Sequence, residues 1–336
     1  MRSIPIVTIT PPVIALLLAA STASAAITID TVFVGDAGNA NDTTIWGDFG
    51  GVAYDYHIGT HEVTNNQYTA FLNAVAATDT HSLYDSRMGT SDFGGISRSG
   101  SDGDYSYSRK ANMADKPVNY VSFWDAARFA NWLTNGQPTG AQRTGTTEDG
   151  MYNLNGTTNP TNTSADRQLD FSSGENGVAV ASENEWYKAA YYDGSGGFYD
   201  YPTQSDDKPT AVAPGSVTGS NNANFADAVG AVTAVGAYPN SASHYGTFGQ
   251  AGNVSEWTDT RFYPYDLIKR GGSFFTNDAG LLSSDRNASD PNFGLSNSGF
   301  RVTSLAPIPE PSSYGAIMGV MGLATAIFFR RKRRRG

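Results

Sequence analysis

Three segments of the chain carry the same local signal for the start of an α-helix. In each, a hydroxyl residue is followed three positions later by a polar side chain that can reach back to the cap. Such a capping box satisfies two backbone amides that the first turn of a helix leaves unpaired. The pairs are Thr64 with Gln67, Ser122 with Asp125, and Ser182 with Glu185. Because apolar residues then recur at helical spacing, the pattern predicts helices at 65–77, 123–134 and 183–192.

The stretches between these helices are long and polar. Asparagine, threonine and glycine are abundant in them, while only 16% of all residues are charged and 12% are aromatic. Two segments, 54–63 and 265–275, mix aromatic and β-branched residues around glycine, which is typical of short strands. The composition therefore predicts a globular protein with short elements, an aromatic core and much ordered loop.

The first 25 residues have the pattern of a secretory signal peptide. Arg2 precedes an apolar run, and Ala23 and Ala25 form an A-x-A cleavage site. We expect signal peptidase to cut after Ala25, so that the mature chain begins near Ala26. A buried N-terminal helix is the alternative, but the small-residue ending favours processing.

The last segment, 305–336, combines a short motif, an apolar stretch and a basic tail. The motif residues are Pro309, Glu310 and Pro311. The uncharged stretch 312–329 is long enough to span a bilayer, and six basic residues follow at 330–335. This order resembles the PEP-CTERM sorting signal, which exosortases read and cleave to deliver proteins to the cell envelope or outside. The expected intermediate crosses the membrane once, with a cytoplasmic C-terminus; a permanent single-pass anchor is the alternative.

The region between the two ends is acidic. Removing Arg2, the six basic residues of the tail and Glu310 from totals of 22 basic and 32 acidic residues leaves 15 and 31, a net charge of −16. This charge argues against nucleic acid as a partner and is compatible with bound cations. Plain solvation of the surface explains it equally well.

The chain contains no cysteine. This excludes a disulfide framework, a zinc–thiolate site and a cysteine nucleophile. His57 and His61 lie four residues apart, a spacing that can hold a metal on a helix, but they fall in a strand-like run with Gly59. We therefore interpret them as surface or packing residues. The residues that begin at Arg270, Arg-Gly-Gly-Ser, lack the spacing of a phosphate loop.

The segment "FGQAGNVSEWTDT" at 248–260 is a candidate calcium site. Gly252 and Asn253 suit a tight turn, and the carboxylate of Glu256 follows directly. Calcium binds six to eight oxygens, and Asn224 and Asp227 offer further oxygen donors nearby in the sequence. The alternative is a buried, hydrogen-bonded glutamate that stabilises the loop.

Six segments together resemble one family, the sulfatase-modifying-factor domain of the formylglycine-generating enzyme and its relatives. The segments, in order, are "HEVTNNQYTAFLNA", "KPVNYVSFWDAARFANWL", "ASENEWYKAAYYD", "FGQAGNVSEWTD", "KRGGSF" and "NSGFRV". The resemblance covers about residues 30–304. It implies a single α+β domain of the C-type-lectin-like kind at 26–304, rich in ordered loops.

The resemblance also implies calcium sites with a structural role. By position, Glu256 matches an acidic ligand, and Gly252 and Val254 would offer backbone carbonyls. Asn224, Phe225 and Asp227 match a second site, although the stretch after them is shorter here. Gly249 is a departure, because the family has an asparagine or aspartate side chain there.

In the active enzyme of the family, two cysteines after Arg-Gly-Gly-Ser bind copper and oxidise a substrate cysteine. The corresponding positions here are Thr276 and Leu281, which cannot supply the thiolates that suit Cu(I). Ser273 and Asn297, which match pocket positions of the family, are retained. We therefore expect neither copper nor formylglycine-generating activity, while the pocket itself is preserved.

Two hypotheses of different class follow. The first is an exported binding or structural module of the envelope or extracellular space, with a surface ligand that the sequence does not identify. The second is a metal-dependent oxidoreductase of the same superfamily, of the nonheme iron type, with an unidentified substrate. The family's iron-dependent branch carries most of its iron histidines in an additional helical domain, for which this chain has no room. The missing cysteines favour the first hypothesis.

Overall fold

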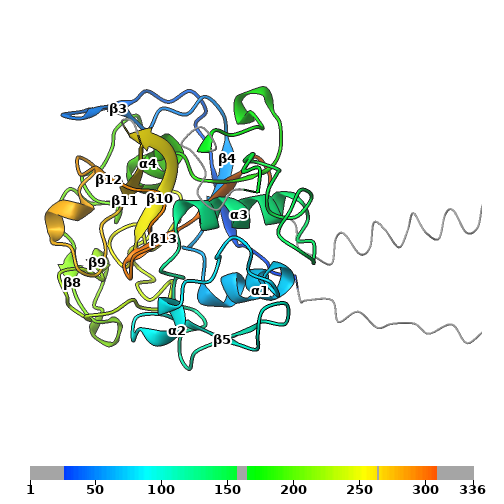
Figure 1. The fold of residues 1–336 in the computed structure, drawn as a ribbon. Coiled ribbons are helices and arrows are strands. Elements are labelled where there is room, and N and C mark those ends of the chain that lie inside the picture. The colour runs from blue at the N-terminus through cyan, green and yellow to red at the C-terminus, as the bar shows by residue number, and fades with distance from the viewer. Residues whose placement is uncertain (1–25, 157–164, 263–264, 309–336) are drawn as a thin grey trace, which may run out of the picture.

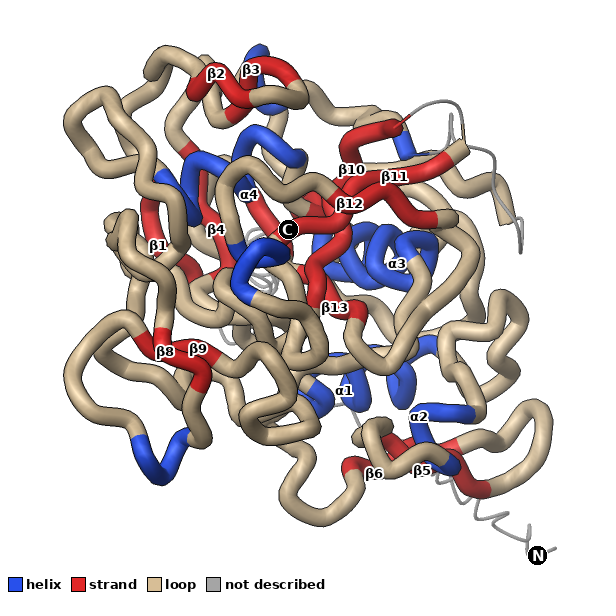
Figure 2. Tube along the Cα trace, turned by 90° about the vertical axis from the view of Figure 1, so that its left-hand side faces the viewer, coloured by secondary structure: helices blue, strands red, loops and turns tan. Residues whose placement is uncertain are grey.

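A computed structural model describes residues 26–156, 165–262 and 265–308. The signal-peptide segment, the sorting motif at Pro309–Pro311 and the apolar stretch 312–329 lie outside the described residues. Loops make up most of the described chain, as Figure 2 shows, and the regular elements are short. The helices of the described residues are α1 (Asn65–Val75), α2 (Arg87–Thr90), α3 (Phe123–Thr134) and α4 (Glu183–Tyr191).

The three predicted helices are confirmed. Each of α1, α3 and α4 begins with the capping box that the sequence indicated, with the cap hydroxyl bonded to the backbone and the third side chain bonded back to the cap amide. The observed ends differ from the predicted ones by no more than two residues. The helix starts are therefore specified by local hydrogen bonds.

Two four-stranded sheets form the framework. The first has the order β1-β4-β14-β7 and is antiparallel throughout; the second has the order β12-β11-β10-β13, with β10 and β13 parallel. Their strands are β1 (Thr31–Val34), β4 (Tyr56–Gly59), β7 (Val178–Val180), β10 (Ser255–Phe262), β11 (Asp266–Arg270), β12 (Asn287–Ser289), β13 (Ser298–Phe300) and β14 (Val302–Ser304). Strands β4 and β11 fall within the two segments predicted as strands.

Three small two-stranded sheets complete the set of strands in the described residues. They pair β2 (Asp42–Thr44) with β3 (Gly47–Phe49), β5 (Ile96–Ser99) with β6 (Ser106–Arg109), and β8 (Thr210–Ala211) with β9 (Asn222–Ala223). Helices and strands thus mix in a single α+β domain, as expected (Figure 1).

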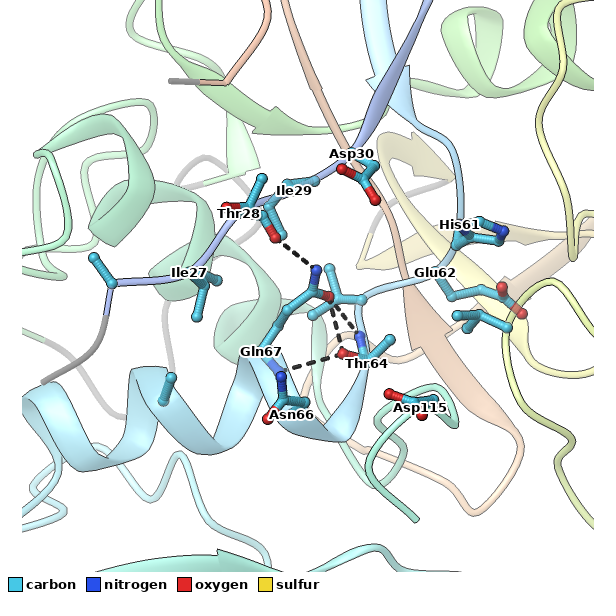
Figure 3. Close-up of a pocket in the computed structure, with 14 residues that line it drawn as sticks. Ile27, Thr28, Ile29, Asp30, His61, Glu62, Thr64, Asn66, Gln67 and Asp115 are labelled. Atoms are coloured by element: carbon cyan, nitrogen blue, oxygen red, sulfur yellow. Dashed lines mark hydrogen bonds between the residues drawn. The ribbon is translucent and has the colours of Figure 1, made fainter. Parts of the chain in front are cut away.

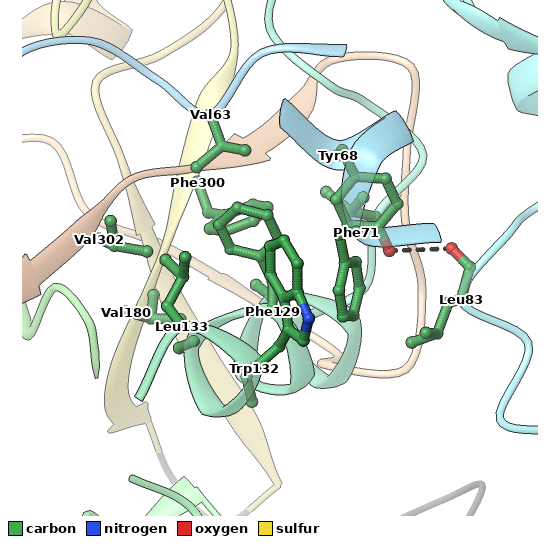
Figure 4. Close-up of a cluster of buried hydrophobic side chains, with 14 of the residues drawn as sticks. Val63, Tyr68, Phe71, Leu83, Phe129, Trp132, Leu133, Val180, Phe300 and Val302 are labelled. Carbon is green, nitrogen blue, oxygen red and sulfur yellow. Dashed lines mark hydrogen bonds between the residues drawn. The ribbon is translucent and has the colours of Figure 1, made fainter. Parts of the chain in front are cut away.

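The main core lies between the helices and the two sheets. Helix α3 contacts both β7 and β10, so it covers the place where the sheets meet. Aromatic rings from α1, α3 and β13 pack edge-to-face there: Phe71 and Phe300 both contact Phe129 with ring centroids 5.4 Å apart (Figure 4). The hydroxyl of Tyr68 donates to the Leu83 carbonyl at 2.9 Å, which satisfies the one polar group of this ring.

The chain crosses from one sheet to the other at a single residue. Arg301 separates β13 of the second sheet from β14 of the first, and it is fully buried. This junction brings β4, β10 and the loop before β10 to one point, where the candidate site lies.

Candidate functional site

The Arg-Gly-Gly-Ser segment is a buried turn that follows β11. Gly271 and Gly272 have φ angles of +88° and +65°, which L-residues rarely adopt. A Cβ on Gly271 would also lie 2.7 Å from the Gln250 carbonyl oxygen. The two glycines are therefore required by backbone geometry and by close packing, and the segment serves as the predicted strand-to-loop element.

The four predicted pocket residues gather around this turn. The side chain of Asn297 donates to the Ser273 hydroxyl at 3.1 Å, and the Thr276 hydroxyl both accepts from the Ser273 amide and donates to its carbonyl, each at 2.9 Å. Leu281 is fully buried in an apolar cluster with Tyr201 and neighbouring residues. Thr276 thus closes the loop on itself, and Leu281 fills a hydrophobic space.

Glu256 lies at the sheet junction, with no exposed surface. Arg301 donates to both of its carboxylate oxygens, at 2.5 Å from Nε and 2.6 Å from Nη2, and the indole of Trp186 donates at 2.8 Å. Arg301 also donates to the Gly59 carbonyl on β4. The carboxylate is therefore held by a bidentate, charge-assisted ion pair that links the two sheets.

A small internal cavity of about 20 Å³ lies next to this junction, behind the loop 247–253. Its walls include Glu62 and Asn224, each only 1% exposed. The Oε2 atom of Glu62 and the Oδ1 atom of Asn224 have no hydrogen-bond partner. A volume of this size holds one water or one ion.

Asn253 connects the two unpartnered groups. Its Nδ2 donates to Glu62 Oε1 at 2.8 Å, and its Oδ1 accepts from Asn224 Nδ2 at 3.3 Å. Burial, and secondarily the nearby Glu256 carboxylate, raise the pKa of Glu62 to about 7. A buried carboxylate with one free oxygen can accept a proton or a cation, and here the amide oxygen of Asn224 faces the same cavity.

The structure explains the departure at Gly249. This residue has a φ of +77°, and a Cβ there would overlap the carboxylate of Glu62. The Glu62 side chain occupies the space that a side chain at position 249 would need. The Glu62 carboxylate therefore places an oxygen close to the position where the resemblance implies the oxygen of an asparagine or aspartate side chain.

The other predicted calcium ligands are distributed around this cavity. Gly252 pairs with Asn224 in a short β-bridge, so the two expected ligand groups come together in space. Phe225 and Val254 are buried in apolar clusters, whereas Asp227 is an exposed turn residue whose amide donates to the Phe274 carbonyl. Of the six predicted ligands, Asn224 is the one that lines the cavity.

The oxygen groups that line the cavity are of the kinds that bind calcium. Its polar walls offer a carboxylate, side-chain amide oxygens and hydroxyls such as that of Thr233, and calcium prefers oxygen ligands of this type. No group of three or more His, Asp or Glu side chains that could hold a metal occurs in the part of the chain that the structure describes. The site would therefore depend on neutral oxygens with a single carboxylate.

A surface groove of about 440 Å³ lies on the other side of Glu62 (Figure 3). The segment Ile27–Asp30 forms one wall and the start of α1 another, and Gln67 bridges them through a 2.9 Å hydrogen bond to the Thr28 carbonyl. Asp30, Glu62 and Asp115 line it. Glu62 thus lies between an acidic surface groove and the internal cavity.

Glu62 is the site residue that the sequence reasoning missed. It directly follows His61 in a run that we judged only for metal-binding histidines. His61 stacks on Phe248 with ring centroids 5.3 Å apart, and burial lowers its pKa to about 4, which agrees with a packing role. The glycine at position 249 was the signal in the sequence that could have indicated Glu62. Its significance depends on the close approach of the Glu62 carboxylate, which the sequence does not show.

Comparison with known proteins identifies the family of the chain. The sequence profile of the sulfatase-modifying factor enzyme 1-like domain matches residues 51–305. The chain belongs to this family. Among solved structures, variable protein 1 of Treponema denticola has 18% sequence identity and a TM-score of 0.50, over 82% of this chain and 95% of that one. The crystal structure of CarF has 21% identity and a TM-score of 0.50, over 83% and 98%.

At such identities these structures support the fold of the family member and nothing more. PvdO from Pseudomonas aeruginosa is also similar, with 16% identity and a TM-score of 0.43 over 82% of this chain and 91% of that one. No curated protein sequence matches the chain. The family's C-type-lectin-like, loop-rich fold is thus established, whereas the site has to be interpreted from its own residues.

A second profile, the PEP-CTERM protein-sorting motif, matches residues 307–335. The protein is therefore exported to the cell envelope, and the motif implies processing by an exosortase. No helix within residues 26–308, apart from the gaps at 157–164 and 263–264, is long and apolar enough to cross a membrane. The stretch predicted to do so, 312–329, falls outside that range.

Proposed function

We propose that this exported domain serves as a binding or structural module on the sulfatase-modifying-factor scaffold, without the family's copper-dependent oxidation. The observation that supports this most is the loop after Arg-Gly-Gly-Ser. Thr276 uses its hydroxyl to close that loop and Leu281 is fully buried in an apolar cluster, so both positions serve packing. Neither side chain offers a ligand for Cu(I).

Metal analysis of the purified full-length protein tests the proposal. We expect calcium alone, or no metal, in the isolated protein. Copper or iron bound in near-stoichiometric amount would overturn the proposal in favour of an oxidoreductase. Because copper and iron prefer different ligands, the identity of the metal would also indicate which branch of chemistry applies.

We further propose that the internal cavity holds a structural calcium ion, with Glu62 and Asn224 as ligands. The support is the coincidence of two buried, unpartnered oxygens in one cavity of ionic size. The resemblance instead names Glu256, whose carboxylate is engaged by Arg301 and Trp186. Two isosteric variants separate these assignments, because each removes one carboxylate and keeps its shape.

The measurement is the change in melting temperature when a calcium chelator is added. Wild type and Glu256→Gln should both respond to the chelator, although Glu256→Gln is less stable because it weakens the ion pair. Glu62→Gln should lose the response. A lost response in Glu256→Gln with a retained one in Glu62→Gln would restore the first assignment, and no response in wild type would remove the calcium proposal.

Processing at the two ends completes the proposal. Signal peptidase would release residues 1–25, and the 312–329 segment would hold the chain in the membrane, with the basic tail in the cytoplasm, until exosortase cleavage. Ile27 and Ile308 are both buried in the main core cluster. In the sequence, the expected cleavage sites thus precede Ile27 and follow Ile308, so processing would remove none of the described core residues.

A further inference from the structure

Two neighbouring cavities lie beside the segment 78–87, which leads into α2. Figure 2 shows α2 and the β5–β6 hairpin at the bottom of the molecule. The volumes of the two cavities are about 360 and 530 Å³, and they share Ser82, Tyr84 and Ser86 as a common rim. Together they form one depression, which we call the Tyr84 groove.

The lining of the Tyr84 groove contains no aliphatic side chain. Every apolar side chain that lines it is aromatic: Tyr84, Tyr105, Tyr120, Trp124 and Phe293. The groove beside α1 differs, because Ile27, Ile29 and Val63 line it together with other aliphatic residues. Extended Pro-rich peptides also dock in aromatic-lined grooves, so a peptide is the competing occupant that the test has to separate from a sugar.

The aromatic residues hold planar hydrogen-bond donors in place. The guanidinium of Arg98 lies 4.8 Å from the ring centre of Tyr84 and 4.3 Å from that of Tyr105. Arg87 lies 4.9 Å from the ring centre of Tyr120 and is paired with Asp85. Stacking fixes the orientation of these groups, so a ligand does not have to order them.

The charges along the groove nearly balance. Four aspartates and three arginines line it, and some of them pair with one another, such as Asp85 with Arg87. Serine and threonine hydroxyls lie between them, and Ser82 and Ser86 on the shared rim are exposed. This arrangement suits a neutral ligand rich in hydroxyl groups more than an ion.

One buried polar atom of the lining residues has no hydrogen-bond partner. His81 lines the groove with a side chain only 4% exposed, and its Nδ1 atom has no hydrogen-bond partner. Its Nε2 lies 3.5 Å from Oε1 of Glu148, the oxygen that also accepts a hydrogen bond from Arg128 Nε. A buried, unpartnered ring nitrogen costs free energy unless a ligand or water satisfies it.

We propose that the Tyr84 groove binds a neutral oligosaccharide. Sugar rings present apolar C–H faces that stack on aromatic rings, and their hydroxyls can bond to the carboxylate, guanidinium and amide groups that line this groove. The ring of Phe293 is 63% exposed and supplies the free aromatic face. The proposal goes beyond the proposed function, since it concerns another face of the domain and does not depend on the metal content.

The test measures binding of labelled oligosaccharides to the full-length protein in a detergent without a sugar headgroup. The panel contains di-, tetra- and hexasaccharides of glucose, mannose, galactose and N-acetylglucosamine, with a set of eight-residue peptides for comparison. We expect at least one sugar series to bind, with a tetrasaccharide binding more tightly than its disaccharide.

Two variants assign the binding to the groove. Phe293→Ser removes the exposed ring, and Ser86→Trp fills the shared rim; both positions are exposed, so the fold should persist. Phe293→Ser should weaken binding about two- to tenfold, the scale of one lost aromatic contact. Ser86→Trp should weaken binding at least as much, because the added ring occupies the shared rim. Ser216→Trp, at an exposed serine outside the groove, should bind like wild type.

Failure of the whole sugar panel would overturn the proposal, as would sugar binding that both groove variants leave unchanged. Binding of peptides but not sugars, lost in the same variants, would also overturn it and would assign the groove to a protein partner. The proposed function is tested by metal analysis and the sugar proposal by binding assays. The failure of one therefore leaves the other unaffected.

Discussion

The contribution of Glu62 to the stability of the fold depends on pH. Its carboxyl group is buried, has one unpartnered oxygen, and has a pKa raised to about 7 by burial and by Glu256. Because the pKa in the folded state exceeds that of the unfolded chain, the folded form is favoured most when Glu62 is protonated. The stability from this proton is complete below about pH 4.5 and is lost as the pH rises through about 7.

We therefore predict a pH-dependent loss of stability in chelator-treated protein. The free energy of unfolding from this group should fall by about 3 kcal/mol between about pH 4.5 and pH 8, from a pKa difference of about 2.5. Glu62→Gln should lack this fall, because its amide does not titrate. Denaturant unfolding at several pH values measures the slope, and the exposed Glu175→Gln serves as control. Equal slopes in wild type and Glu62→Gln would contradict the prediction.

Arg301 and Glu256 provide a second prediction for single residues. Arg301→Met should destabilise the domain by about 3–5 kcal/mol, because it leaves the Glu256 carboxylate buried without its partner. The double variant Arg301→Met with Glu256→Leu should recover much of this loss, since no buried charge remains. Denaturant titration of the single and double variants gives the coupling energy.

The exposed pair Arg261–Asp166 is the matched control. Arg261→Met should cost less than about 1 kcal/mol, as solvent screens that pair. A loss in Arg301→Met no larger than in Arg261→Met would show that the buried pair does not stabilise the sheet junction.

The sequence identified the loop of the candidate site, but the contacts of its acids depend on residues far along the chain. Glu256 was interpreted as a calcium ligand or a hydrogen-bonded buried glutamate, and the structure shows the contacts of the second alternative. The choice depends on Arg301, which is 45 positions away in the sequence. Likewise, the importance of Glu62 follows from its approach to Gly249 across the fold. Such contacts leave no local pattern.

Helices and strands differ in how far local sequence specifies them. The capping boxes predicted the starts of α1, α3 and α4 because the side chains that satisfy the first amides lie within three residues of one another. The strands are only two to eight residues long, and many pair with partners far along the chain, as β14 does with β4. Pairing of this kind was not visible in the sequence, so the two sheets could be expected only through the family resemblance.

The capping box of α1 gives a prediction at this scale. Thr64→Ala should lower the free energy of unfolding by about 1 kcal/mol, because the backbone amide of Gln67 loses the Thr64 hydroxyl as its acceptor. Thr64→Ser keeps the hydroxyl and should stay close to wild type. Thermal unfolding followed by circular dichroism measures both variants. If the Thr64→Ala and Thr64→Ser variants had the same melting temperature, the hydroxyl at position 64 would not stabilise the start of α1.

At the scale of the whole molecule, both ends of the described chain pack into the domain. Ile27 and Ile308 lie in the same core cluster, and Gln137 bonds to both the amide and the carbonyl of Ile27. In the sequence, the PEP motif begins at Pro309, directly after Ile308, the last residue that the structure describes. Cleavage at or after this motif would therefore remove none of the described core residues.

We predict that the extracellular or envelope-bound protein lacks the Arg-rich tail, because exosortase processing separates it from the domain. Mass spectrometry of the protein recovered from a host with an exosortase should find no peptide from residues 330–335 in that fraction. Replacement of Pro309, Glu310 and Pro311 by alanine should leave the tail attached and keep the protein in the inner membrane. The melting temperature should be the same for the processed protein and the alanine variant, since the described core residues end at Ile308, before the motif. An intact tail on extracellular wild-type protein would show that the segment is a permanent anchor or that another route releases the chain.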